Sequence, residues 1–260
     1  MFEAKANEAA GFKQIIEAIR DMITDCNFDC SNSGIALQAL DKSHIVLISL
    51  LLGPEGFNDY RCDHAVTLGV NMASLATILR CGSNQDQMTL RCDDQPDSLG
   101  LTFDDGKHDR ISEFSIKLME IDQEYLSIPE TEYTASITMP SADLQKYLRD
   151  LRQLSESVSI TANKDEVIFA AAGDVGDGAV HVRQYTDSEN PDKSVSINIS
   201  EPVSLNFNLH YFNNITKAAT LSDTVTLQLA DGTPASIEYK LPSGHIRYYF
   251  APKIGGDDDV

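Results

Sequence analysis

The sequence predicts an α+β protein of two similar domains, each containing two repeats in which a strand leads to a helix and the helix leads to further strands. Two observations support this prediction. Amphipathic helical patterns recur at four places along the chain, and segments with strand character flank each of them. The length agrees, because 260 residues are enough for two domains of ordinary size with a core in each.

The first helix of each half has one clear apolar face. Residues 12–23 and 141–154 both repeat apolar side chains at intervals of three and four. Ser141 follows Pro140 and is expected to cap the second of these helices. Segments with strand character precede the two helices and follow them; these segments are residues 2–6, 34–41, 44–52, 133–139, 157–162 and 166–172.

A second pair of helices follows the same plan. The expected helices are residues 72–80 and 211–218, each after one strand-like segment and before two others. The two helices match position for position, since Leu75, Ile78 and Arg80 correspond to Phe212, Ile215 and Lys217. This internal repeat predicts four equivalent units, two per half.

The segment between the halves has neither a helical nor a strand period. It carries several acids around Pro129, but its apolar Leu126 and Ile128 argue against a fully solvated tether. We therefore expect a domain at residues 1–117, a connector at 118–134, a second domain at 135–254 and an acidic flexible tail at 255–260.

The charge pattern poses a question, because forty acids and twenty bases give a net charge of -20. Such a balance argues against nucleic acid unless the bases gather in one place. Seven of them fall on the predicted helices, on the sides away from the apolar stripes: Lys13, Arg20, Arg80, Lys146, Arg149, Arg152 and Lys217. On a single helix, such bases would indicate only an ordinary solvent-exposed face. Four together predict a positive surface that contacts phosphates without reading bases.

Acids share these helical faces, so the predicted surface is mixed rather than purely basic. The acids are Glu17, Asp21, Asp143 and Asp150. If the strands form sheets with the helices on one side, the bases pool on that side while most acids cover the other.

Other protein classes find little support in the sequence. No apolar run is long enough to span a membrane, and the first residues lack the pattern of a secretory signal. Cys26 and Cys30 are better explained as buried thiols than as half of a metal site, since no second pair follows at suitable spacing. No nucleophile, phosphate-loop or metalloprotease motif is present. We expect an intracellular protein without enzymatic activity, metal or cofactor.

Several motifs together resemble one known family. They include residues 33–47 (SGIALQALDKSHIVL), 55–63 (EGFNDYRCD), 128–133 (IPETEY), 201–211 (EPVSLNFNLHY) and 248–254 (YYFAPKI). In this order they resemble the proliferating cell nuclear antigen family of eukaryotic DNA sliding clamps, over residues 1–254.

The resemblance implies the DNA clamp fold, in which antiparallel sheets form the outer wall of a homotrimeric ring and helices line its channel. It implies a processivity factor for DNA polymerase that encircles duplex DNA in the nucleus. It also implies docking of replication, repair and translesion synthesis proteins through clamp-binding peptides, and loading by an ATP-dependent clamp loader. Two alternatives stay open: a subunit of a heterotrimeric checkpoint-type clamp, and an acidic hydrolase.

The resemblance also assigns residues. Six of the seven bases, all except Arg152, correspond to channel bases of the family, whereas Gln14, Thr77 and His210 stand where relatives often carry a base. Lys164 matches a position that accepts ubiquitin-like modifiers, although on sequence alone it is an exposed turn lysine. The partner-peptide pocket would be formed by Leu40, His44, Ile45, Leu126, Ile128, Pro234, Tyr249, Ala251, Pro252 and Ile254.

Ring closure requires two different sheet edges that pair head to tail. Residues 109–117 alternate Phe114 and Ile116 with polar side chains, and residues 179–183 present Val180 and Val182 in the same way. We expect these four residues at the interface between subunits.

Overall fold

Two compact units make up the chain in the computed structural model, which describes residues 1–94, 96–123, 126–128 and 131–253. The first unit contains Met1–Ser127 together with Lys240–Ile246. The second contains Ile128–Tyr239 together with the segment from Arg247 onward. The division falls inside the predicted connector, and the predicted domain boundaries themselves stay a prediction.

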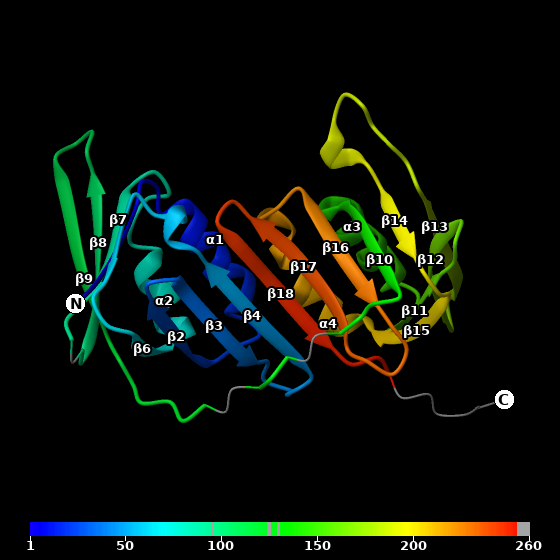
Figure 1. Cartoon of the computed structure of the whole chain (residues 1–260), viewed down its shortest axis with the longest axis horizontal. Helices are drawn as coiled ribbons and strands as arrows, with labels where there is room; N and C mark the ends of the chain where they lie inside the picture. Colours follow the sequence, from blue (N-terminus) through cyan, green and yellow to red (C-terminus); the bar gives the residue numbers. More distant parts are fainter. Residues whose placement is uncertain (95, 124–125, 129–130, 254–260) are drawn as a thin grey trace. The chain divides into compact units, whose positions relative to one another are not determined.

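In its described residues, the first unit has two groups of paired strands and the α-helices α1 and α2 (Figure 1). One sheet runs in the order β5-β1-β7-β8-β9, and the strands of the other run β4-β3-β2-β6; paired strands are antiparallel. The elements are β1 (Phe2–Ala6), α1 (Ala10–Ile19), β2 (Asp25–Ser31), β3 (Gly34–Leu40), β4 (Val46–Leu52), η1 (Pro54–Gly56), β5 (Asp59–Cys62), β6 (Val66–Asn71), α2 (Met72–Leu79), β7 (Gln87–Cys92), β8 (Ser98–Asp105) and β9 (Arg110–Lys117).

The second unit repeats this plan. Its sheets run β13-β12-β11-β15 and β14-β10-β16-β17-β18, again with antiparallel pairing. The elements are β10 (Ala135–Pro140), α3 (Ser141–Leu151), β11 (Ser157–Ala162), β12 (Glu166–Gly173), β13 (Gly176–Arg183), η2 (Pro191–Lys193), β14 (Ser196–Ile199), β15 (Val203–Asn208), α4 (Leu209–Ile215), η3 (Thr216–Thr220), β16 (Thr224–Leu229), β17 (Ala235–Leu241) and β18 (Gly244–Phe250). The end of β17 and the start of β18 fall within Lys240–Ile246, which is counted with the first unit.

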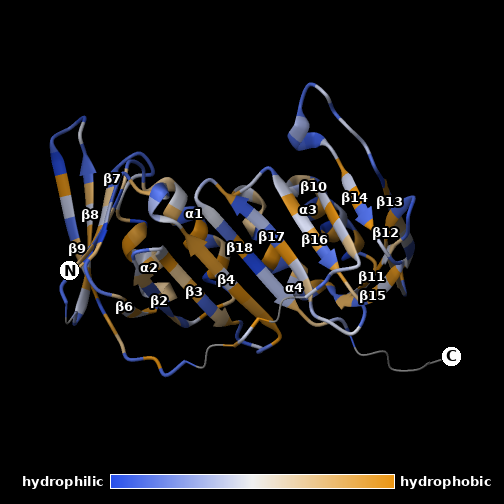
Figure 2. Cartoon of the chain, viewed as in Figure 1, coloured by the Kyte–Doolittle hydropathy of each residue, from blue (hydrophilic) through white to orange (hydrophobic). Residues whose placement is uncertain are grey.

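The core of each unit explains why these segments fold together. In the first unit, Phe12 of α1 and Leu75 of α2 meet Phe28 of β2 and Leu90 of β7, so the helices and both sheets share one apolar interior. Strand β4 is almost uniformly hydrophobic in Figure 2, yet only alternate residues from Val46 to Leu52 are buried. In the second unit, the rings of three phenylalanines pack with centroids 5.0 to 5.7 Å apart; they are Phe207, Phe212 and Phe250. The predicted α+β class with antiparallel sheets is confirmed.

The helices differ from the sequence prediction at their ends. The apolar pattern of the first helix continues to Ile23, but α1 ends at Ile19, and the next residues form a tight turn in which Met22 and Ile23 donate to the Ile19 carbonyl at 3.0 and 3.1 Å. Both apolar side chains are nevertheless buried, so the pattern indicated burial correctly and helix length incorrectly.

The expected cap at Ser141 is wrong. Ser141 is the first residue of α3, and its buried hydroxyl oxygen has no hydrogen-bond partner among the described residues. Caps occur instead at two equivalent positions of the repeat. The Asn71 side chain accepts from Ser74 N at 3.0 Å before α2, and the Asn208 side chain accepts from His210 N at 2.9 Å before α4.

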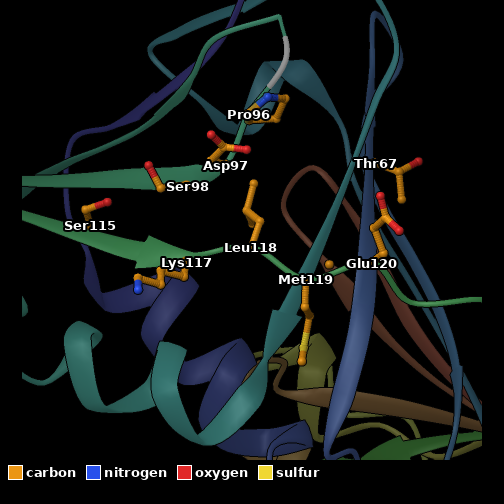
Figure 3. A pocket seen from close by; sticks show the side chains of 10 residues that line it. Thr67, Pro96, Asp97, Ser98, Ser115, Lys117, Leu118, Met119 and Glu120 are labelled. Carbon is orange, nitrogen blue, oxygen red and sulfur yellow. The ribbon is translucent and has the colours of Figure 1, made fainter.

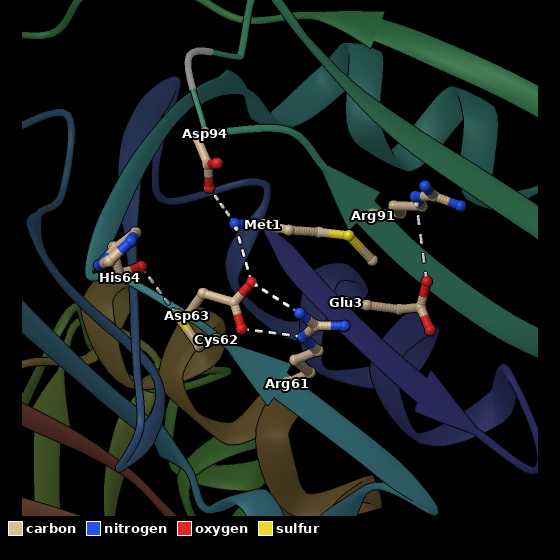
Figure 4. A network of polar contacts seen from close by, with 8 residues as sticks. All are labelled: Met1, Glu3, Arg61, Cys62, Asp63, His64, Arg91 and Asp94. Atoms are coloured by element: carbon tan, nitrogen blue, oxygen red, sulfur yellow. Dashed lines mark hydrogen bonds and ion pairs between the residues drawn. The ribbon is translucent and has the colours of Figure 1, made fainter.

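The amino terminus is tied to two loops by charge (Figure 4). The Met1 ammonium contacts the Asp94 carboxylate and lies 3.5 Å from Asp63 Oδ2. Arg61 holds Asp63 with two hydrogen bonds, from Nε at 2.8 Å and from Nη2 at 3.0 Å. The hydrogen bond to Asp94, reinforced by the nearby carboxylates, raises the pKa of the Met1 ammonium. Met1 directly precedes β1, which lies between β5 and β7, and Asp63 and Asp94 follow those two strands, so these contacts fasten the start of β1 on both sides.

This geometry predicts a pH dependence of unfolding. A raised pKa means that the stabilisation is complete below the unfolded value of about 8 and disappears as pH rises through the folded value. Replacing Asp94 by Asn removes the main partner, so the variant's melting temperature should fall less between neutral and alkaline pH than that of the unaltered chain. Asp93→Asn is the matched control. Equal pH slopes in all three proteins, measured by thermal unfolding, would contradict the assignment.

Candidate functional site

Basic residues mark the carboxyl ends of the helices in all four repeats. Arg20, Arg80 and Arg152 are the C-caps of α1, α2 and α3, and Lys217 lies in η3 directly after α4. A cation at this end of a helix interacts favourably with the partial negative charge of the unpaired carbonyls. The sequence repeat therefore places a base at the C-cap of three helices and one residue after the C-cap, Thr216, of the fourth.

The α3 helix shows how the two faces separate. Leu144, Leu148 and Leu151 are buried, whereas Lys146 and Arg149 are exposed on the same helix. Arg152, at its end, is also exposed. Burial of the leucine stripe against the sheet thus leaves the three bases in solvent.

The first unit holds its bases in a tighter network. Glu17 of α1 accepts from Arg80 at 3.1 Å through Nη2, and its other oxygen lies 2.6 Å from Arg20 Nε. Lys13 Nζ donates to the Gly82 carbonyl at 2.9 Å. All three predicted bases of this unit are therefore engaged at the junction of α1 and α2. Sequence reasoning identified Glu17 only as an acid on the same face, because Arg80 is 63 residues away.

The second unit has a more open arrangement. Arg149 and Arg152 border a cleft of about 150 Å³ between α3 and α4, which Leu209 and Asn213 also line. The Gln145 side chain donates to the Thr216 carbonyl at 2.8 Å and joins α3 to the end of α4. Arg149 Nε is 3.6 Å from Asp150, and no ion pair of Lys146 or Arg152 occurs within the described part of the chain.

The three positions where family members often carry a base are all exposed. Gln14 lies on α1, and Thr77 of α2 donates its hydroxyl to the Ala73 carbonyl at 2.8 Å. His210 lies in the first turn of α4, beside the Asn208 cap. Each therefore faces solvent without adding a permanent positive charge.

Four residues of the predicted peptide pocket belong to the first unit. His44 and Ile45 are exposed on the turn between β3 and β4, and Leu40 at the end of β3 is half-buried. This turn is fixed by Asp41, whose carboxylate accepts from the backbone nitrogens of Ile45 and Val46 at 2.7 and 2.8 Å. Ile45 is 42% exposed, so part of its apolar side chain is accessible to a partner.

The fourth, Leu126, is held by Gln38 of β3. The Gln38 amide donates to the Leu126 carbonyl at 2.8 Å and accepts from Leu126 N at 2.8 Å. The Gln123 side chain in turn donates to the Gln38 carbonyl. Leu126 is 41% exposed despite these two hydrogen bonds. Gln38 was not predicted, and its polar side chain on a strand gave no signal of a connector contact.

The other pocket residues belong to the second unit, as does Ile128, where that unit begins. Pro234 is exposed on the turn before β17, and its carbonyl accepts from the Tyr133 hydroxyl at 3.4 Å. Tyr249 is half-buried on β18, and Ala251 and Pro252 follow that strand. The backbone nitrogen of residue 253 donates to the Asn206 carbonyl at 2.7 Å and fixes this segment. Ile254 lies outside the described residues.

The two strands predicted for ring closure end their sheets: β9 has β8 as its neighbour and β13 has β12. Their burial patterns are identical at all eight positions. Ile116 and Val182 are buried within their own units. Phe114 and Val180 lie two residues earlier, on the same face of their strands, and are half-buried, with Phe114 packed on Phe103 at a ring-centroid distance of 6.0 Å.

Two exposed apolar residues beside these edges were not predicted. Ile111 on β9 is 62% exposed, and Val175, in the turn before β13, is 81% exposed. Lys164 is exposed in the turn between β11 and β12, which the bond from Asn163 N to the Glu166 carbonyl closes at 2.9 Å.

A separate cleft of about 640 Å³ lies in the first unit where the connector begins (Figure 3). Lys117, Leu118 and Met119 line it, and the Met119 nitrogen donates to the Gly69 carbonyl at 2.9 Å. None of the predicted site residues lines this cleft. It is therefore distinct from the predicted peptide pocket.

Cys26 and Cys30 are buried, as predicted, and burial raises the pKa of the Cys26 thiol to about 12. Cys81 is exposed. Among the described residues, no group of three or more His, Cys, Asp or Glu side chains is arranged to hold a metal ion. Nor does any described helix combine the length and apolar character needed to cross a membrane.

Comparison with known proteins covers both halves. Residues 1–125 match the family described as "Proliferating cell nuclear antigen, N-terminal domain", and residues 127–254 match its C-terminal domain. Proliferating cell nuclear antigen of Chaetomium thermophilum is 51% identical over 259 residues, covering 99% of this chain and 100% of the relative. That of Saccharomyces cerevisiae is 43% identical over 258 residues, with the same coverage. The chain therefore belongs to the proliferating cell nuclear antigen family, the non-enzymatic sliding clamps that act as processivity factors in DNA replication.

Proposed function

We propose that this chain forms a homotrimeric ring in the nucleus, that an ATP-dependent loader places the ring on duplex DNA, and that the basic helix ends face the DNA. The observation that carries the proposal is the recurrence of a base at the end of every repeated helix, at Arg20, Arg80, Arg152 and Lys217. Lys13, Lys146 and Arg149 add charge within the helices α1 and α3.

Such an arrangement suits contact with phosphates rather than with base edges. Lysine and arginine reach phosphate oxygens from a helical surface without any helix entering a groove. The resulting affinity is independent of sequence and falls with salt, because each neutralised phosphate releases a counterion. These are the properties that a clamp needs in order to move along duplex DNA.

The first test removes the exposed bases of α3. Replacing Lys146, Arg149 and Arg152 together by Ala should weaken duplex binding and reduce the salt slope by roughly 0.9 for each phosphate that is no longer neutralised. Fluorescence anisotropy against salt concentration measures both. The matched control removes three bases that lie off the helices, Lys42, Arg61 and Arg91. An equal reduction in both triple variants would show that only net charge matters and would contradict the proposed channel.

We propose that ring closure pairs β9 of one subunit with β13 of the next. Both strands end their sheets and carry the same alternation of exposed and buried residues over their last six positions. Pairing would satisfy the open backbone groups and cover the apolar surface of Ile111 and Val175. Two different edges make a head-to-tail contact, which closes into a ring when the rotation permits.

The second test charges each edge separately. Phe114→Asp and Val180→Asp should each give monomers by light scattering, since each carboxylate would sit at a half-buried position of an edge strand and would lose its remaining water, uncompensated, when the two edges pair. Ile45→Asp is the control, because Ile45 is exposed on the turn after β3. Trimers from both edge variants at micromolar concentration would place the interface elsewhere.

Partner proteins are proposed to dock through peptides on the apolar residues assigned above, with Leu126 and Ile45 as the exposed members in the first unit. Anchoring side chains concentrate binding energy where apolar surface is accessible yet rigid. The Gln38 bonds supply that rigidity to Leu126. Lys164, on its exposed turn, is the proposed acceptor for ubiquitin-like modifiers.

The third test concerns Gln38. Gln38→Ala removes both hydrogen bonds to Leu126, so a clamp-binding peptide should bind roughly tenfold more weakly, as expected when about 1 to 1.5 kcal/mol of ordering interaction is removed. Trimer mass and DNA binding should not change. Thr89→Ala on β7 is the control for a polar strand residue. Undiminished peptide affinity, measured by calorimetry, would remove Gln38 from the site.

A further inference from the structure

The strongest unassigned feature is the carboxylate that joins two of the proposed DNA-contacting bases. Glu17 lies on α1 with its side chain 44% exposed, and each of its two oxygens is close to a different arginine. Oε1 accepts from Arg80 Nη2 at 3.1 Å and Nε at 3.3 Å. Oε2 lies 2.6 Å from Arg20 Nε, without the alignment of a hydrogen bond. One acid thus pairs with the bases that end both helices of the first unit.

These ion pairs reduce the net positive charge that the helical bases of the first unit present to DNA. Arg20 also lies 3.9 Å from Asp21, and Lys13 is bound to the Gly82 carbonyl. In the second unit, by contrast, Arg149 has one acid at 3.6 Å, and Lys146 and Arg152 make no ion pair with any described residue. The repeated helices therefore carry bases at equivalent positions but with unequal neutralisation.

We propose that Glu17 lowers the electrostatic contribution of the first unit to the affinity for duplex DNA. This inference rests on the proposed contact of the helical bases with phosphates. Glu17 competes with a phosphate for Arg20 and Arg80, and it cancels part of the positive field that attracts the duplex. Because exposed ion pairs are weak, a phosphate displaces the Glu17 carboxylate easily, and both arginines can still bind DNA phosphates.

The chemistry fits the needs of a moving ring. A base that is bound to phosphate without competition must break that contact at every step along the duplex. A neighbouring carboxylate offers the guanidinium an alternative partner of the same geometry, since carboxylate and phosphate both accept from its fork of donors. Glu17 therefore weakens the contact of each arginine with a phosphate but makes it easier for the arginine to exchange one phosphate for the next. It has this effect on both Arg20 and Arg80.

The alternative role is that of an organiser. If Glu17 mainly holds Arg20 and Arg80 in the positions that fit phosphates, its removal would weaken binding. The two roles predict opposite signs, and Glu17→Gln separates them. Gln keeps the length of the side chain, still accepts a hydrogen bond, and is as good a helix former as Glu. The substitution removes the charge while leaving α1 intact.

The experiment uses the full-length chain, with duplex DNA as the probe and fluorescence anisotropy over a range of salt concentrations. Glu17→Gln is expected to bind roughly two- to fivefold more tightly at low salt, in line with the removal of an exposed ion pair, and to have a steeper salt slope. Single-molecule tracking of the loaded ring should show slower diffusion. Asp192→Asn is the charge-matched control on η2, and it should change neither property.

A second set of variants assigns the effect to the arginines. In Glu17→Gln combined with Arg20→Ala and Arg80→Ala, the gain should disappear. Weaker binding by Glu17→Gln, a gain that survives removal of both arginines, or an equal gain in Asp192→Asn would each overturn the proposal. If Glu17→Gln has no effect while the α3 triple variant still binds more weakly, Glu17 has no such role and the channel proposal stands. If both variants leave binding unchanged, the channel proposal itself fails.

Discussion

The constraint on which the rest of the structure depends is the burial of one apolar helix face against the sheets of each unit. In α3, this burial involves Leu144, Leu148 and Leu151. Because the helix period is fixed, burying these leucines forces Lys146 and Arg149 into solvent. The same logic applies at α1, where Ile15, Ile16 and Ile19 are buried. Packing energy, rather than any interaction with a ligand, thus determines where the bases lie.

Repetition turns this local constraint into a surface. One exposed base after a helix has no functional meaning, since a cation is favoured there by the helix carbonyls alone. Four helices that end in this way, in a protein with a net charge of -20, form a pattern that stability does not require. The Asn71 and Asn208 caps repeat at the other end of α2 and α4, so both termini of these helices follow the same plan.

The sequence predicted those features that depend on local periodicity. The strands flanking the helices, the four helices and the exposed bases follow from intervals of two, three and four residues. Features that depend on distant pairs were not accessible in this way. Glu17 meets Arg80, and Gln38 meets Leu126, only because the fold brings them together. No property of Gln38 within β3 distinguishes it from other polar strand residues. Strand β2 gives a weak strand signal for a different reason: two of its buried positions are Cys26 and Cys30, and cysteine behaves as a small apolar residue when its thiol is buried.

The acidic composition and the proposed contact with DNA are compatible on physical grounds. At physiological ionic strength, interactions between exposed charges fade over roughly 8 Å, so acids farther away than this scarcely oppose a phosphate at Arg149. What matters is the balance within that distance. Asp150 and Glu17 act within it, at 3.6 Å from Arg149 and 3.1 Å from Arg80. In the proposed contact, a few acids next to the helical bases therefore govern the affinity for DNA, and the remaining acids are free to repel non-specific partners.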